Sequence, residues 1–152
     1  MELRDILLVL HIAGAGTWLG ANVVQAVVPP LAAKQNPQAA AGWYRVAGAL
    51  SSRLYMPVSI LILATGIWMV LISDDAYSFG SVFVTIGFAA IVVGALLGIF
   101  VFGPGSQRAA EALESGDSQA IRAASGRIAG FGVLDTLIIL FTITVMVIKL
   151  GA

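Results

Sequence analysis

The sequence predicts an all-α membrane protein, a bundle of four transmembrane helices with up-down topology. Only 11% of its 152 residues are charged and 59% are hydrophobic, whereas a soluble domain carries about 25% charged residues. The mean hydropathy is +0.98. Four stretches almost free of charge are each long enough to cross a bilayer, which takes about 20 apolar residues. We expect one domain over residues 1–152.

The predicted spans follow the charge-free stretches in order. They are residues 6–28, 54–73, 81–103 and 128–149. Helices are favoured over barrel strands because runs such as 91–97 do not alternate apolar and polar residues. The first span is expected to be a mature helix, because its leading residues carry no net positive charge and its apolar run exceeds that of a signal peptide.

Lysine and arginine are unevenly distributed over the connections. Those following the first and third spans hold six of the eight: Lys34, Arg45, Arg53, Arg108, Arg122 and Arg127. Cytoplasmic loops are enriched in these residues. We therefore expect loops 1 and 3 to be cytoplasmic and both termini to be extracytoplasmic. The formal net charge of zero argues against a nucleic-acid-binding protein.

The two basic connections carry helix signals of their own. Asn36-Pro37 is typical of a helix start, and residues 38–52 are expected to run straight into the second span. The third connection predicts a short helix through Glu111 and Glu114 that breaks at 115–117. A further helix is expected to begin at Ser118 and merge with the last span.

Glycine-lined faces predict where helices pack closely, because small residues let helices approach one another in lipid. The third span carries Gly94 and Gly98 on one stripe with Gly87, and the first span carries Gly16 and Gly20. The protein is expected to contact the lipid bilayer, and these faces are expected to contact a second copy of the chain or a partner membrane protein. The sequence leaves open whether the contacts are internal.

The first span has one polar face. His11, Trp18, Asn22 and Gln25 fall within a sector of about 60° at helical periodicity. Polar side chains in a membrane usually face the bundle interior. We therefore expect this face to point inward, towards partner side chains or a cofactor.

Two intramembrane groups of residues are candidates for chemistry. At one depth lie His11, Met69 and Met146, and imidazole with thioether ligands suits Cu(I) or a heme iron. The alternative is that the histidine bonds a carbonyl and the methionines only pack.

The second group centres on Asp135, at the depth of Asn22, with Tyr55 and Ser59 nearby. An intramembrane carboxylate is a functional candidate by default. If Asp135 is ionised, Arg53 is its expected partner; if it is neutral, Asn22 is. A proton-coupled transporter and a structural lock between helices both remain open.

The segment 10–20, which reads LH, six residues, then WxG, resembles the first helix of the copper-resistance-protein-D-like and HemJ-like superfamily of small bacterial membrane proteins. The resemblance implies a helix bundle in the bacterial cytoplasmic (inner) membrane. It also implies that His11 binds heme b or assists copper handling, with Trp18 and Gly20 as framework. The chain has no second histidine, which argues against the protoporphyrinogen oxidation of HemJ-like proteins.

The numbers of histidines and cysteines exclude several kinds of metal site. The chain has one histidine and no cysteine, which excludes two-histidine metal motifs, thiolate ligands and iron–sulfur clusters. The sequence favours a heme or copper binding module over an enzyme. A structural or accessory membrane subunit without cofactor, and a small proton-coupled transporter using Asp135, are the alternatives.

Overall fold

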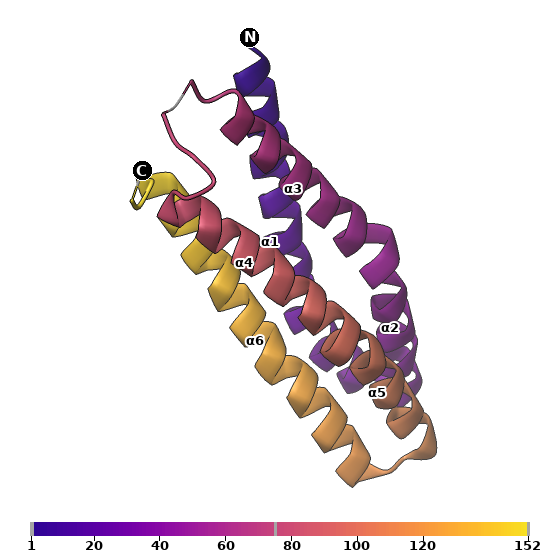
Figure 1. The fold of residues 1–152 in the computed structure, drawn as a ribbon. Helices are drawn as coiled ribbons and strands as arrows, with labels where there is room; N and C mark the ends of the chain where they lie inside the picture. Colours follow the sequence, from indigo (N-terminus) through magenta and orange to yellow (C-terminus); the bar gives the residue numbers. More distant parts are fainter. Residues whose placement is uncertain (1, 75, 152) are drawn as a thin grey trace.

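The computed structural model describes residues 2–74 and 76–151, and its regular secondary structure there is helical. Four helical runs are long and apolar enough to cross a membrane, as the sequence predicts. They lie side by side as a bundle (Figure 1). Both ends of the chain and the α3–α4 connection lie at one end of the bundle, and the α1–α2 and α5–α6 turns lie at the other.

Helix α1 (Leu3–Gln35) is longer than the predicted 6–28. It continues through Pro29 and Pro30 and ends where the backbone of Asn36 becomes extended. Its 33 residues span about 50 Å at 1.5 Å per residue, against a hydrocarbon core about 30 Å thick. The helix is therefore longer than one crossing of the hydrocarbon core requires.

The second run consists of α2 (Pro37–Leu50), the π-helical segment η1 (Ser51–Tyr55) and α3 (Met56–Leu71). The side chain of Asn36 caps α2 by accepting a hydrogen bond from the Ala39 amide at 2.7 Å. The predicted helix start at Asn36-Pro37 and the continuous run into the second span are both confirmed.

The third run consists of α4 (Val82–Leu97), the π-helical segment η2 (Gly98–Phe102) and α5 (Gly103–Ser115). The helix continues past residue 103, where the third span is expected to end, and passes into α5 without a break. Gly116, with a φ of 71°, ends α5, and Asp117 caps α6 (Ser118–Ile148). The predicted break at 115–117 and restart at Ser118 are confirmed.

Each π-helical segment lies just before a proline, Pro57 after η1 and Pro104 after η2. A proline cannot donate the usual backbone hydrogen bond, and its ring crowds the preceding turn. One wider turn relieves that crowding and lets the helix continue. The two segments face each other, since a Cβ at Gly98 would lie 3.9 Å from Ser51 Oγ.

The apolar core is divided between the two ends of the bundle. Phe83, Val84 and Val145 form a cluster near the termini. The second cluster lies between α2, α5 and α6, and its buried members are Ala41, Tyr44, Ala109 and Ala110. Alanines let α2 and α5 approach closely. A set of polar side chains occupies the region between these clusters.

Large apolar side chains cover the outside of the bundle. Each long run contributes residues more than half exposed, for example Val9, Ile60, Val92 and Val133. A soluble protein rarely exposes so continuous an apolar surface. The surface therefore indicates that the helices contact a lipid bilayer. It also indicates that the chain is a multi-pass membrane protein.

Candidate functional site

Asp135 of α6 is the centre of the polar region between the two apolar clusters. Its side chain is only 3% exposed. Its Oδ2 accepts a hydrogen bond from Asn22 Nδ2 at 2.7 Å and another from Trp18 Nε1 at 3.2 Å. Trp18 and Asn22 are four residues apart on α1, so one face of the helix supplies both donors.

Tyr55 extends this network to the second helical run. Its hydroxyl donates to Asn22 Oδ1 at 3.1 Å, so both polar atoms of the asparagine side chain are engaged. The Tyr55 ring also meets the Trp18 ring edge to face, with centroids 6.1 Å apart. Because Tyr55 is the last residue of η1, the π-helical segment is linked directly to α1, and through Asn22 to Asp135 of α6.

Glycine 94 brings α4 into the same site. A Cβ at this position would lie 2.5 Å and 2.7 Å from two carbons of the Trp18 ring, and 3.8 Å from Asp135 Oδ1. Only a glycine therefore leaves room for the indole that donates to Asp135. The stripe predicted on the third span is thus an internal packing face at Gly94. Gly87 is a further case, since a Cβ there would collide with Met146 Cε.

The predicted basic partner of Asp135 takes no part in this network. Arg53 is exposed, and among the described residues the ion pair found joins Arg45 to Glu114. Of the two alternatives, the structure has Asn22 as the hydrogen-bonding partner of Asp135. Gln25 is half-buried and lies near the Tyr55 hydroxyl, at the edge of the network.

His11 forms a second polar site, on the interface between α1 and α3. Its Nδ1 lies 3.0 Å from the Ile62 carbonyl oxygen and 3.0 Å from Thr65 Oγ1. A carbonyl oxygen only accepts, so this contact requires a proton on Nδ1; in the neutral ring, the lone pair of Nε2 is then free. Gly66 leaves room for the ring, since a Cβ there would lie 3.3 Å from His11 Cε1.

The two methionines predicted beside His11 have different surroundings. Met146 packs on Gly87 of α4, against the apolar cluster near the termini. Met69 is half-buried on α3, three residues beyond Gly66. In the structure, His11 therefore contacts α3, whereas Met146 contacts α4. Over residues 2–74 and 76–151, no three side chains among His, Asp and Glu converge to hold a metal ion.

The two polar sites share helix α1. Seven residues separate His11 from Trp18, which corresponds to about 10 Å along the helix axis. The inward orientation predicted for the polar face is confirmed, since Trp18 is buried and His11, Asn22 and Gln25 are half-buried.

Sequence reasoning missed Thr65, which is 4% exposed and holds His11. A threonine in an apolar helix is common, and no spacing rule connects it to a histidine on another helix.

Comparisons with known proteins add no relative. No protein-family model, curated protein or solved structure matches the chain.

Proposed function

We propose that the protein is a membrane-embedded binding module that holds heme b or a copper ion through Nε2 of His11. The observation that carries this proposal is the hydrogen bond from His11 Nδ1 to the Ile62 carbonyl. Metal-ligating histidines almost always donate their other ring N–H to a carbonyl or carboxylate, which fixes the tautomer and the ring orientation. Thr65 adds a second fixed contact on the same nitrogen.

The donor set fits a cofactor that needs one protein nitrogen. His11 supplies a single imidazole, and the thioether of Met69 lies on the same helix as the groups that orient the ring. A bis-histidine heme within one chain is excluded, because the sequence has no second histidine. The resemblance of segment 10–20 to the copper-resistance-protein-D-like and HemJ-like superfamily supports the same choice of ligand.

The test is to purify the chain in mild detergent and measure its absorption spectrum and metal content. A Soret band or stoichiometric copper is expected, and His11→Ala should abolish it. Thr65→Val removes a contact that orients the ring and should weaken binding about 10-fold or more. Thr142→Val is the matched control, because Thr142 bonds only to Ile138 of its own helix. A colourless, metal-free wild type would overturn the proposal.

Proton-coupled transport is the second candidate function, favoured by the buried carboxylate of Asp135. Ionisable groups inside a membrane commonly mark ion or proton pathways. Proton flux into liposomes that is lost in Asp135→Asn, with the fold intact by circular dichroism, would establish it. A chain with neither cofactor nor flux would be assigned to the structural or accessory class.

We further propose that loops 1 and 3 face the cytoplasm and that both termini lie outside, in a bacterial inner membrane. The distribution of lysine and arginine supports this orientation. The chain has no cysteine, so single cysteines introduced at exposed Ser118 and Ser78 report the two sides separately. An impermeant thiol reagent added to whole cells should label Ser78→Cys alone.

Association with a second copy, or with a partner membrane protein, is proposed through the glycine face of α1. A Cβ at Gly16 or at Gly20 would meet no atom within 4 Å, so this face is open in the single chain. Close helix pairs in membranes form on such faces. Cross-linking in membranes that is lost in Gly16→Leu and kept in Gly130→Leu would support the proposal, since Gly130 is equally open.

A further inference from the structure

The polar network around Asp135 extends towards one end of the bundle only. Asn22 connects the carboxylate to the Tyr55 hydroxyl, and Gln25 lies near that hydroxyl. Along α1, Asn22 lies about 6 Å and Gln25 about 10 Å beyond Trp18, in the direction of the turn into α2. The network therefore leads from the buried carboxylate towards the end where α2 and α5 lie (Figure 1).

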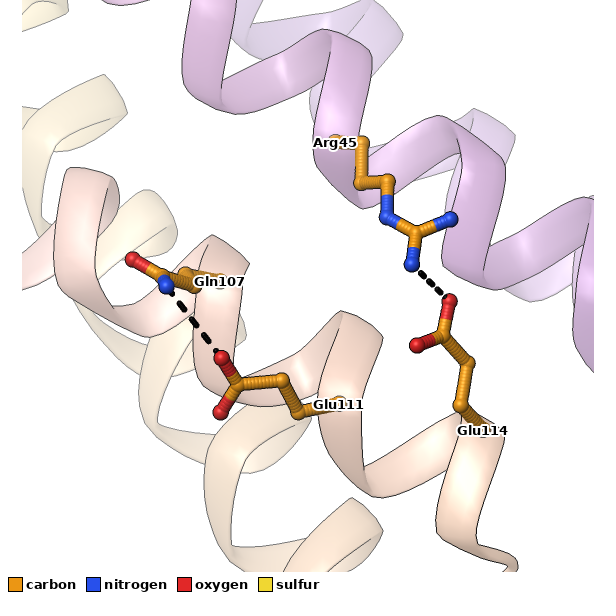
Figure 2. Close-up of polar contacts among 4 residues, drawn as sticks. All are labelled: Arg45, Gln107, Glu111 and Glu114. Atoms are coloured by element: carbon orange, nitrogen blue, oxygen red, sulfur yellow. Dashed lines mark hydrogen bonds and ion pairs between the residues drawn. The ribbon is translucent and has the colours of Figure 1, made fainter.

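Charged side chains begin directly beyond this network. Arg53, two residues before Tyr55 in η1, is exposed. Farther out, the ion pair of Arg45 with Glu114 joins α2 to α5 (Figure 2). Charged groups are costly in hydrocarbon, so they mark the level at which water and headgroups are available. Tyr55 therefore lies close to that level.

Towards the other end, the surroundings of Asp135 are apolar. On α1, Gly14 packs so closely on α3 that a Cβ would lie 2.7 Å from Ile62 Cγ1. The polar residue beyond it, His11, bonds to α3 and not to this network. On α6, Thr142 lies about 10 Å from Asp135 along the axis and donates to a carbonyl of its own helix. Beyond it lies the apolar cluster near the termini.

The side chains packed around Asp135 do not compete with it for a proton. Trp18 and Asn22 face it from α1, and Gly94 faces it from α4; none of these residues has a titratable side chain. The hydroxyl of Tyr55 in η1 donates to Asn22, and a phenol ordinarily titrates at about pH 10. A proton that enters this network therefore has Asp135 as its acceptor.

We propose that Asp135 exchanges protons with water only at the α2–α5 end of the bundle, along the polar lining formed by Asn22, Tyr55 and Gln25. The inference rests on proton-coupled transport, the second candidate function, and adds the side of access and the residues that line it. In this arrangement a proton from water on that side bonds to a carboxylate oxygen and leaves to the same side. Transport then requires a second arrangement, in which the lining closes and the packing of Gly14 opens.

The test measures from which side of the membrane position 135 can be reached. Asp135→Cys carries a single thiol, because the chain has no cysteine. A small impermeant methanethiosulfonate reagent is added to either side of sealed vesicles. Ser118→Cys and Ser78→Cys, exposed at the two ends of the bundle, identify the sides. Asn22→Cys, which keeps the bond from Trp18 to Asp135, gives the same readout if Asp135→Cys does not fold.

Labelling is expected only from the side that labels Ser118→Cys. Labelling from the side of Ser78→Cys, from both sides or from neither would overturn the proposal. Proton flux is measured separately in liposomes with the wild type. Flux together with two-sided labelling keeps the transport function and rejects one-sided access, whereas one-sided labelling without flux keeps the access route and rejects transport.

Two further variants connect access to the polar lining. In Asp135→Cys, the added change Gln25→Leu makes the lining apolar and should slow labelling about fivefold to tenfold, the effect of losing one hydrogen bond to water. Thr142→Val is the matched control, because it removes a half-buried polar group on the opposite side of position 135 and should leave the labelling rate unchanged. Equal effects of the two changes would refute the assigned route.

Discussion

Replacing Asp135 by leucine tests whether the buried carboxylate holds the bundle together. Leucine has a similar size but no acceptor, so the N–H groups of Trp18 and Asn22 lose their partner. Hydrogen bonds between membrane helices average about 0.6 kcal/mol each, so two give about 1.2 kcal/mol. Two buried donors left unpaired would cost about 2–6 kcal/mol. We expect a loss of about 2 kcal/mol in the free energy of unfolding.

The assay is reversible unfolding in mixed micelles of dodecyl maltoside and sodium dodecyl sulfate, followed by far-ultraviolet circular dichroism. Asp135→Asn is the control, because its amide oxygen still accepts from both donors. A double-mutant cycle with Asn22→Leu isolates the shared hydrogen bond, since residues in one network give non-additive changes. Unchanged stability in Asp135→Leu would show that the carboxylate contributes nothing to folding, and strict additivity with Asn22→Leu would show that the two side chains are not coupled.

Three further predictions concern single positions. Gly94→Leu should destabilise the bundle by about 1–3 kcal/mol, because the new side chain displaces the Trp18 ring; Gly130→Leu, which meets open space, should unfold like the wild type in the same assay. Gly151→Val should lower the melting temperature, because Gly151 has a φ of +67° and a Cβ there would lie 2.7 Å from Val82 Cγ2; an unchanged melting temperature would contradict this packing. Asn36→Ala removes the cap of α2 and should cost about 1 kcal/mol, whereas Asn36→Ser should restore most of it.

The four long helices could be predicted from sequence because a membrane span is recognised by hydropathy averaged over about 20 residues, which few single residues can alter. The inward face of α1 was readable for a similar reason, since burying polar groups among lipid is costly. Helix ends were harder to predict. Pro29-Pro30 is a typical helix break, yet α1 passes through it to Gln35, and the π-helical turns that carry the chain past Pro57 and Pro104 have no sequence signature.

For the candidate sites, the depth of a side chain could be predicted, but the helix that it faces could not. The match in depth between Asn22 and Asp135 follows from helix rise alone, and the two side chains are hydrogen-bonded. Depth alone cannot say which of several helices a side chain faces, so Met146 shares a level with His11 but packs on α4. A long arginine can reach many partners from one position, so sequence alone cannot assign a partner to Arg53; in the structure its side chain is exposed.

The turn that follows α6 supplies hydrogen-bond acceptors to the first residues of α4. The first amides of α4, at Val82 and Phe83, donate to the carbonyl oxygens of Gly151 and Leu150 at 3.4 Å and 3.1 Å. A helix beginning normally satisfies such amides with its own cap or with water, but Ser81 makes no side-chain cap here. Synthesis runs from α1 to α6, so these two acceptors of α4 are made only after α6. The start of α4 therefore depends on residues that follow α6 in the chain, and a fusion placed directly after Leu150 would remove the acceptor of the Val82 amide.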